Sequence, residues 1–433
     1  MTMRPEVTLR EWTTLAAGTP GGAALDGVYL DAADVRRVAD QLRERQVLDV
    51  RENRHGLVLS ARQHVGVVQL GAVRVSIQPK LPPDALWAAL AYGLGGAAEL
   101  RAPSVSLAMT GSFADVLAAL MLDAADALRR AGIQRAYSPR ETWMDVPRGR
   151  PDQATLAKSG PLTRAALPCR HHAYDADHAL NGAVLTGLTL AERVAVDLRL
   201  RGALHRAVQE WSIFTRPLAL TGLSWAAIHK SRSRLTERYA TAHQVAELLH
   251  EGMGADDALA AGAHQVRAHV WNMASLFERF VARFLQENLS GVEVVTQDRL
   301  RALYTVDIGL HGHRAPTPRP DLVIRRRKKT LAVLDTKYVN LSKPPLGRDI
   351  LYQMSVYAMA WSAEADSDVP AIVLYPGTEE SPDVVYRLHP VGEGQPRRII
   401  LRSVSWARAS GMLAGRERRV DRAALAGQWV GVA

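Results

Sequence analysis

The chain has 433 residues, of which 47% are hydrophobic and 23% are charged, the composition of a globular protein with two or three domains. Its 54 Lys and Arg outnumber 44 Asp and Glu, and the net charge of +10 favours a polyanionic partner, nucleic acid before an anionic membrane. The single Cys169 excludes a disulfide framework and a Cys-rich zinc module. Because we find no secretory leader and no apolar stretch that could span a bilayer, we expect a cytoplasmic protein.

The first part of the chain, residues 1–160, is predicted to be an α+β region. Residues 33–46 have the pattern of an exposed amphipathic helix, and residues 57–80 alternate β-branched and polar residues in short strands that turn at Gly71. Helices are predicted over 84–94 and 113–131. The Pro-, Gly- and charge-rich stretch 141–160 indicates strand plus loop and a domain boundary.

The middle part, residues 161–262, is predicted to be mostly helical. The helical pattern extends from 177 to 250 and is interrupted by a basic connector at 230–240. Small residues accumulate between Gly252 and Gly262, which indicates a linker to the next domain.

The last part, residues 263–433, is predicted to be an α/β domain. It opens with a helix over 268–289 whose apolar stripe contains three of the five phenylalanines of the chain, so this helix lies in a core. A second helix is predicted over 349–363. Strands are predicted over 292–297, 301–308, 321–327, 331–338, 370–375, 383–388 and 398–405. This order of elements indicates a sheet flanked by helices.

Two neighbouring strands of this domain carry the residues best suited to chemistry. Asp321 begins the first strand, and Asp335, Thr336 and Lys337 end the second. Side chains alternate along a strand with period two, so Asp335 and Lys337 share a face, and antiparallel pairing would bring Asp321 to them. The side chain of Thr336 should turn away while its carbonyl oxygen faces the site.

Two carboxylates and a carbonyl oxygen are ligands that suit Mg²⁺. Bound Mg²⁺ activates water and stabilises charge on a phosphoryl oxygen, and Lys337 could orient that water or neutralise the developing anion. The pattern therefore predicts phosphodiester hydrolysis. A turn aspartate and a chance Asp-x-Lys are the ordinary alternative, but burying two charges on an apolar strand is costly unless they have a partner or a task.

Three further residues are candidates for the same site. Glu278, beside the phenylalanine stripe, could supply a third carboxylate or could be a solvated helix charge. Gln353 and Tyr357 are four residues apart on one face of the helix 349–363 and could face the metal site or a DNA backbone. A surface amide and a half-buried tyrosine are the alternative.

Five consecutive cations join the two strands: Arg325, Arg326, Arg327, Lys328 and Lys329. Such a run can be simply a soluble turn. Because it extends from the predicted site, we favour contact with DNA phosphates.

The spacing of Pro320-Asp321 and Asp335-Thr336-Lys337 resembles the PD-(D/E)XK nuclease signature, with Glu278 and the Gln353/Tyr357 pair as its helical accessories. Three phrases resemble more specifically the McrC family, the nuclease subunits of McrBC restriction systems. These phrases are residues 65–80, residues 148–152, and residues 276–281 followed by the Asp321 to Lys337 block.

The resemblance implies a C-terminal restriction-endonuclease-like domain that cleaves double-stranded DNA with Mg²⁺ bound by Asp321, Asp335 and Thr336. It also implies a partner, an AAA+ GTPase of the McrB kind that forms hexamers and whose GTP hydrolysis is stimulated. Contacts with that partner would fall within residues 1–160. Since no Gly-x-x-x-x-Gly-Lys-Ser/Thr motif is present, this chain itself should bind no nucleotide.

Two other functions compete with this prediction. One is an inactive activating subunit of an AAA+ complex, against which the intact Asp321, Asp335 and Lys337 argue. The other is a helicase-coupled DNA-repair nuclease of the same superfamily, which Gln353 and Tyr357 also fit. The N-terminal phrase that ends in Pro79-Lys80 argues against this second alternative.

Overall fold

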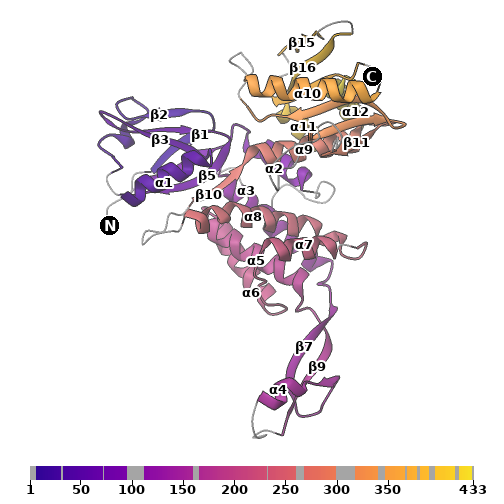
Figure 1. Cartoon of the computed structure of the whole chain (residues 1–433). Helices are drawn as coiled ribbons and strands as arrows, with labels where there is room; N and C mark the ends of the chain where they lie inside the picture. The colour runs from indigo at the N-terminus through magenta and orange to yellow at the C-terminus, as the bar shows by residue number, and fades with distance from the viewer. Residues whose placement is uncertain are drawn as a thin grey trace, which may run out of the picture. The chain divides into compact units, whose positions relative to one another are not determined.

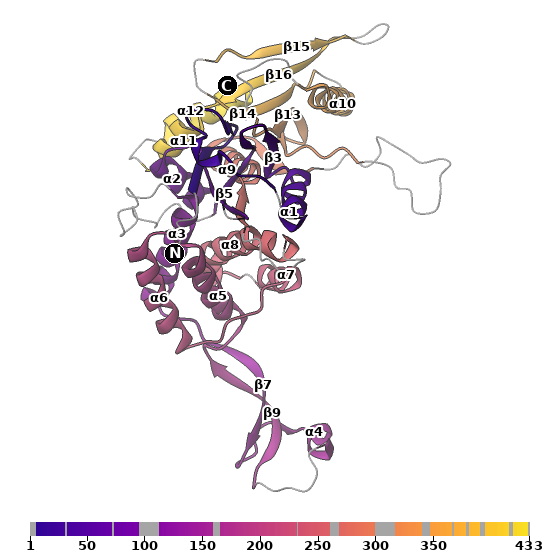
Figure 2. The same ribbon diagram turned by 90° about the vertical axis from the view of Figure 1, so that its left-hand side faces the viewer.

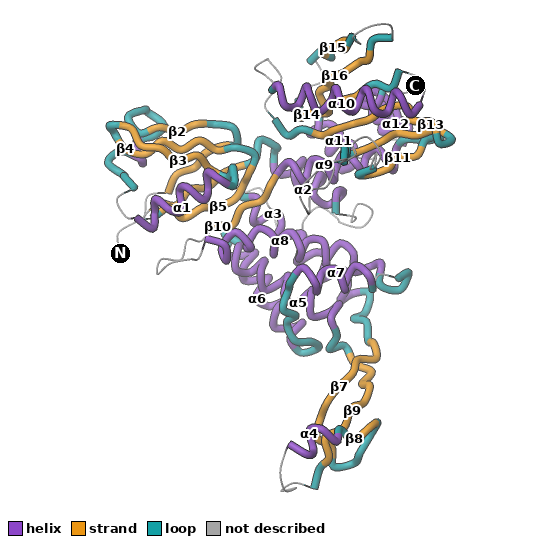
Figure 3. Tube along the Cα trace, viewed as in Figure 1, coloured by secondary structure: helices purple, strands orange, loops and turns teal. Residues whose placement is uncertain are grey.

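The structure is a computed structural model with side chains (Figure 1). It describes residues 6–30, 33–71, 73–94, 112–158, 165–231, 233–259, 268–298, 317–339, 347–365, 368–377, 381–389, 395–414 and 419–431. The chain divides into two compact units, the first made of Met1–Glu99 with Ala255–Ala433 and the second of Leu100–Gly254. Within the described ranges, no helix combines the length and the apolar character needed to cross a bilayer. The predicted mixed α/β chain with several domains is confirmed by these elements (Figure 3).

The first unit begins with two small sheets and helix α1 (Ala33–Glu44). The larger sheet has the order β1-β6-β5-β10, and the smaller one β2-β4-β3. Their strands are β1 (Glu6–Arg10), β2 (Thr14–Ala16), β3 (Leu48–Asn53), β4 (Gly56–Ala61), β5 (His64–Leu70), β6 (Val73–Gln78) and β10 (Ala268–Asn272). The predicted turn at Gly71 joins β5 to β6, and its φ of +57° is one that glycine adopts without strain.

One predicted helix of this unit is partly wrong. Residues 268–272 do not open the helix predicted over 268–289, because they form β10 and pair antiparallel with β5. Helix α9 (Met273–Asn288) starts only after Asn272, whose side chain accepts a hydrogen bond from the N–H of Ala274 at 2.9 Å. A long-range strand pairing therefore overrides the helical pattern at this end and joins the C-terminal elements to the N-terminal sheet.

The same unit contains a six-stranded sheet of order β11-β12-β13-β14-β16-β15. Helix α10 packs against β13, β14 and β16 on one side, and α9, α11 and α12 lie on the other (Figure 2). The elements are α2 (Pro83–Gly93), β11 (Glu293–Thr296), β12 (Leu322–Arg326), β13 (Lys329–Thr336), α10 (Arg348–Ala365), β14 (Ala371–Pro376), β15 (Val384–Leu388), β16 (Arg397–Val404), α11 (Trp406–Ala414) and α12 (Arg419–Val430). The strand predicted over 301–308 lies outside the described residues.

The second unit is a group of helices that carries a long strand ribbon. Its elements are α3 (Phe113–Arg130), β7 (Ala136–Met144), β8 (Arg150–Pro151), α4 (Gln153–Lys158), β9 (Leu167–Asp175), α5 (Ala179–Val194), α6 (Leu198–Ser212), α7 (Gly222–Lys230) and most of α8 (Ala240–Leu259). The ribbon of β7 and β9, with β8 and α4, projects away from the helices of this unit (Figure 1).

The linker predicted over residues 252–262 is partly wrong. Helix α8 continues to Leu259, because Glu251, Met253 and Ala255, which flank the glycines, favour a helix and an interior glycine costs only about 1 kcal/mol. Residues 260–262 lie outside the described residues. The predicted division at 160 and 262 stays a prediction.

Candidate functional site

The predicted pairing of the two strands is present in the structure. β12 and β13 run antiparallel with Leu322 opposite Leu334, so that Asp321 and Asp335 follow at the same end of the hairpin. The carboxylate of Asp321 is fixed there, because its Oδ2 accepts two hydrogen bonds of 2.7 Å from Thr336, one from the backbone N–H and one from Oγ1. The alternation predicts that the side chain of Thr336 turns away from the site. This prediction is wrong, because Oγ1 of Thr336 binds the carboxylate of Asp321.

Asp335 is the most enclosed group of the site, with 2% of its surface exposed. Its Oδ2 forms an ion pair with Nζ of Lys337 at 2.7 Å. Its Oδ1 lies 3.5 Å from Nε2 of Gln353 on α10. Asp335 thus faces one cation and one amide, both from residues that the sequence had selected.

The surroundings of Asp335 change the pKa of its carboxyl. Burial is the main cause that raises the pKa of its carboxyl to about 6, and the charge of Asp321 raises it further. The ammonium of Lys337 acts in the opposite direction, and Glu278 adds a smaller increase. A buried carboxylate beside a second carboxylate stays ionised at neutral pH only with a cation close by. Lys337 fills that role in this structure.

Glu278 lies on α9, half-buried and within electrostatic range of the other acids. Burial raises the pKa of its carboxyl, the charge of Asp321 raises it further, and Gln297, Arg279 and Lys337 lower it. This environment differs from that of a fully solvated helix charge. Within the part of the chain that the structure describes, no three His, Cys, Asp or Glu side chains are grouped closely enough to hold a metal ion.

Gln353 and Tyr357 contact each other as their spacing suggests. The amide of Gln353 donates to the hydroxyl of Tyr357 at 2.9 Å, and Tyr357 is buried with its ring edge-on to Trp361 at 5.7 Å. Tyr357 thereby holds Gln353 toward Asp335. Asp321, Asp335 and Lys337 lie at one end of the sheet, and Gln353 approaches them from α10.

The donor set fits a magnesium ion. Both carboxylates offer hard oxygen atoms, and Oδ2 of Asp335 already faces one cation, the ammonium of Lys337 at 2.7 Å. Two protein carboxylates suffice for Mg²⁺, since this ion retains several water ligands. The carbonyl oxygen of Thr336 as a third ligand stays a prediction.

The cationic turn lies at the opposite end of the hairpin from the acids. Five strand steps separate Asp321 from Arg326, which corresponds to about 17 Å. Arg325 is bound to Asp298 at 2.5 Å, whereas residues 326–329 are exposed. Arg327 and Lys328 have φ of +47° and +69°, the type I′ turn conformation that Asn-Gly favours and that strains other residues. This turn could contact DNA several base pairs away from the acids, but not at the acids themselves.

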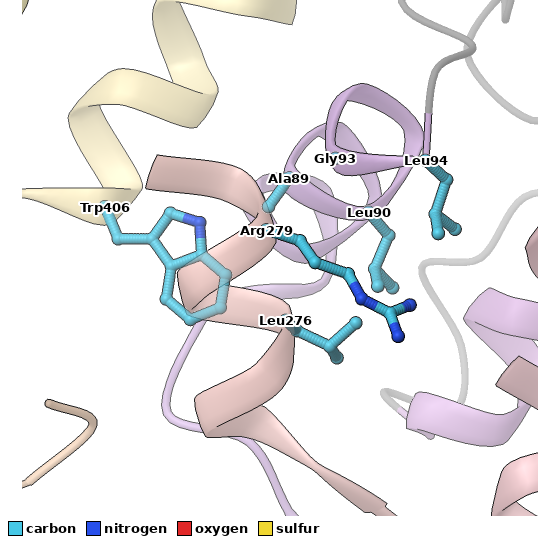
Figure 4. Close-up of a pocket in the computed structure, with 7 residues that line it drawn as sticks. All are labelled: Ala89, Leu90, Gly93, Leu94, Leu276, Arg279 and Trp406. Atoms are coloured by element: carbon cyan, nitrogen blue, oxygen red, sulfur yellow. The ribbon is translucent and has the colours of Figure 1, made fainter. Parts of the chain in front are cut away.

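A small pocket elsewhere in the first unit is not part of this site. It lies between α2, α9 and Trp406, and Leu90 and Leu276 line it beside the side chain of Arg279 (Figure 4). Its walls are nearly all apolar, and none of its lining residues is an acid or a histidine. It is suited to packing rather than to hydrolysis.

Comparison with known families gives the context for this geometry. The family model described as "McrBC 5-methylcytosine restriction system component" matches residues 59–376, well over half of the chain. The chain belongs to this McrBC family. The resemblance to McrC-type subunits that the sequence predicted is thereby confirmed at the level of the family.

One solved structure is similar in fold to this McrBC-family chain. A chain of the structure described as a half-complex of Thermococcus gammatolerans McrB AAA+ hexamers with bound McrC is 16% identical, with a TM-score of 0.54 over 96% of this chain and 98% of that chain. A chain of the Thermococcus gammatolerans McrBC complex is 18% identical, with a TM-score of 0.40 over 65% of this chain and 88% of that chain. No curated protein matches the chain.

Proposed function

We propose that this McrBC-family chain is the Mg²⁺-dependent DNA endonuclease subunit of a modification-dependent restriction complex. The observation that carries the proposal is the convergence of Asp321, Asp335 and Lys337 at one end of the β12–β13 hairpin. We propose further that the six-stranded sheet with α9 and α10 is a nuclease domain of the PD-(D/E)XK type. The basic net charge of +10 supports a nucleic-acid substrate.

The roles of the residues follow from their contacts. Asp321, held by Thr336, and Asp335, which faces the ammonium of Lys337, would bind Mg²⁺. When bound, this ion lowers the pKa of a water ligand and stabilises charge on a phosphoryl oxygen. Lys337 would donate to the oxygen that becomes negative at the scissile phosphate. Gln353 would keep Asp335 oriented, and Glu278 would add negative potential that favours a divalent cation.

Replacing the buried acid tests this proposal. Asp335→Ala should reduce Mg²⁺-dependent cleavage by at least about 10²-fold and leave binding of the AAA+ partner intact, because the charge that holds the cation is lost. Cleavage is measured on methylated double-stranded DNA with the partner and GTP present. Asp383→Ala, which removes an exposed aspartate paired with Arg402 in the same unit, is the matched control and should cut normally.

The competing functions predict other results. An inactive activating subunit would stimulate GTP hydrolysis while the unmodified chain leaves DNA uncut at every Mg²⁺ concentration. A repair nuclease would cut without the GTPase and without modified bases. Full cleavage by Asp335→Ala would show that the site has been assigned wrongly.

We propose that an AAA+ GTPase hexamer of the McrB kind is the partner, as in the complexes to which this chain is similar in fold. The ribbon of β7 and β9 is the element best suited to contact it. The rings of Tyr137 and Tyr174 contact each other, with centroids 4.9 Å apart and a tilt of 43°, although they are 73% and 58% exposed, and Trp143 is 44% exposed. Aromatic side chains that are this exposed on a projecting ribbon are typical of a protein interface.

The base of this ribbon is rigid enough to support such a contact. Arg140 binds Asp175 at 3.2 Å and Asp177 at 2.9 Å, and Arg216 also binds Asp177. Burial alone would raise the pKa of Asp177, but hydrogen bonds from Arg216 and Arg140 outweigh it and lower that pKa to about 2. Asp177 therefore stays ionised at neutral pH and keeps its ion pairs with both arginines at the base of the ribbon.

Removing two of the exposed rings tests the partner surface. Trp143→Ala with Tyr174→Ala should weaken binding of the GTPase by about 10-fold or more and reduce its stimulation equally, since each buried aromatic anchor contributes 1 kcal/mol or more. The measurement is GTP turnover titrated with this chain. Val420→Ala removes an exposed side chain outside the ribbon and is the control. Unchanged stimulation by the double variant would contradict the assignment.

A further inference from the structure

A buried carboxylate in the N-terminal part of the first unit is not explained by the local fold. Glu11 follows β1, is 0% exposed, and its backbone N–H donates to the carbonyl of Gln78 at 3.0 Å. Its Oε1 accepts hydrogen bonds from the N–H of Lys80 at 2.7 Å and from the hydroxyl of Tyr338 at 2.6 Å. Burial raises the pKa of this carboxyl, and these contacts lower it in part. A carboxyl group buried at such cost usually has a structural or functional task.

The contact partner of Glu11 lies directly beside the proposed catalytic residues. Tyr338 follows Lys337 in the chain and is itself buried. Its ring packs edge-on against Trp406 at 5.9 Å and against Phe277 at 6.0 Å. Phe277 directly precedes Glu278. Two site residues, Lys337 and Glu278, are therefore chain neighbours of rings in one buried aromatic cluster.

The segment that carries Lys337 is held from two sides. On the side of the sheet, the N–H of Lys337 donates to the carbonyl of Leu374 at 2.9 Å, just after β13 ends. On the side of the N-terminal strands, the hydroxyl of Tyr338 binds Glu11. Lysine has a flexible four-carbon side chain, so the position of its ammonium depends on the backbone that carries it. A displacement near 1 Å in a catalytic group can reduce a rate by about 10²-fold.

We propose that Glu11 is a positioning residue for the nuclease site and acts through the hydroxyl of Tyr338 to hold Lys337 against Asp335. This inference rests on the proposed nuclease function. It makes DNA cleavage depend on the N-terminal strands of the chain, more than 300 residues before the catalytic lysine in the sequence.

The experiment uses the full chain with its AAA+ partner, modified DNA, GTP and Mg²⁺. Tyr338→Phe keeps the ring packing and removes only the hydroxyl, and should lower kcat of cleavage about 10- to 100-fold with KM for DNA unchanged within twofold. Glu11→Leu removes the acceptor and should have the same effect. Glu11→Gln keeps an oxygen acceptor of the same shape and should restore kcat to within threefold of the unmodified chain.

Tyr92→Phe is the matched control. Tyr92 is another buried tyrosine of the first unit, and its ring packs against Phe280 at 5.7 Å. Its hydroxyl contacts Asn288 at 3.4 Å, the carbonyl of Arg283 at 3.5 Å and the carboxylate of Glu287, none of which belongs to the proposed site. This variant should leave kcat unchanged. GTP turnover should be normal in every variant, and thermal unfolding checks that each one is folded.

The outcomes separate the two proposals. If the unmodified chain shows no Mg²⁺-dependent cleavage, the nuclease function itself is wrong. If the unmodified chain cuts DNA and a folded Tyr338→Phe variant keeps its kcat, the positioning role is overturned. It is also overturned if the loss appears in KM alone, or if Glu11→Gln loses as much activity as Glu11→Leu. Should Glu11→Leu fail to fold, Tyr338→Phe and Glu11→Gln still decide the question.

Discussion

At one end of the β12–β13 hairpin, Asp321 and Asp335 hold their charges in a largely enclosed site, whereas at the other end residues 326–329 hold theirs in solvent. At the enclosed end each carboxylate has identified partners. Thr336 binds Asp321, and both Lys337 and Gln353 contact Asp335. The exposed end has an unusual backbone instead, with two cations at positive φ.

The two ends of the hairpin differ in the kind of free-energy cost that their charged residues bring. A buried charge costs free energy through desolvation, so it needs partners or a cation, and its pKa moves. An exposed charge is solvated and screened, so the cost at this end is conformational, in the backbone of the turn. We therefore expect changes at the enclosed end to alter chemistry and pH dependence, and changes at the exposed end to alter affinity and salt dependence.

The largest expected effect comes from removing the cation of the enclosed end. Lys337→Ala should lower kcat by about 10²-fold or more and shift the acidic limb of kcat/KM to higher pH. The ammonium lowers the pKa of Asp335, so its loss moves that pKa further above about 6, and the ionised form needed to bind Mg²⁺ then appears only at higher pH. Rates measured from pH 5.5 to 8.5 check this.

The same change at the exposed end provides the contrast. Lys329→Ala removes a lysine from the other end of the same hairpin and should leave both kcat and the acidic limb in place. An unshifted pH profile in Lys337→Ala would mean that this lysine does not influence the ionisation of Asp335.

The second effect is on stability without Mg²⁺. The pKa of Asp335 is raised from 3.8 to about 6 in the folded chain, so the folded state keeps the proton that the unfolded state loses first. Stability should therefore fall as pH rises from about 4 to about 6, by at most about 3 kcal/mol. Asp335→Asn cannot ionise and should unfold at a higher temperature at pH 7, while it no longer cuts DNA.

Thermal unfolding at pH 4.5 and pH 7 in the presence of a chelator measures this difference. Asp383→Asn, at an exposed position of the same unit, serves as the control. If Asp335→Asn loses stability equally at both pH values, the carboxyl is not destabilising when ionised.

The smallest effect is expected at the exposed end. Arg327→Asn with Lys328→Gly should stabilise the chain by about 1 kcal/mol, because Asn-Gly adopts this turn without strain. The same double change should weaken DNA binding and reduce the slope of log affinity against log salt by about 1 to 2, since up to two phosphate contacts are lost. DNA retention over a salt series measures it.

Arg325→Ala is the comparison for that turn. Arg325 is already bound to Asp298, so its loss should change the salt slope little and stability by less than about 1 kcal/mol. If the double variant neither gains stability nor changes the salt slope, the strained cations have no role in DNA contact.

Much of the site followed from local pattern. Period-two alternation predicted that Asp335 and Lys337 share a face, and the turn between the two neighbouring strands suggested their antiparallel pairing. The four-residue spacing predicted that Gln353 and Tyr357 share a helix face, and in the structure they also contact each other. The strands over 370–375, 383–388 and 398–405 are found within one or two residues. These features depend only on residues close in the sequence, and they are therefore readable from it.

Other features depended on residues that lie far apart. The local pattern of residues 268–272 predicts a helix, but in the structure they form a strand because β5, some 200 residues earlier, pairs with them. The stretch 141–160 was predicted to be a boundary, and the structure places most of it in a projecting ribbon that forms only when β9 pairs with β7. Glu11 carries no motif, and only its contact with Tyr338 makes it notable.

The sequence by itself determined the chemical groups, their spacing, the basic charge and the periodicity that shapes each element. Only the tertiary structure decided which charges are buried and which distant strand supports the lysine beside Asp335. The physical reason is that the two kinds of feature depend on residues at different distances along the chain. Side-chain alternation depends on a few neighbouring residues, whereas the desolvation of a charge and the pairing of a strand depend on distant segments that fold against it.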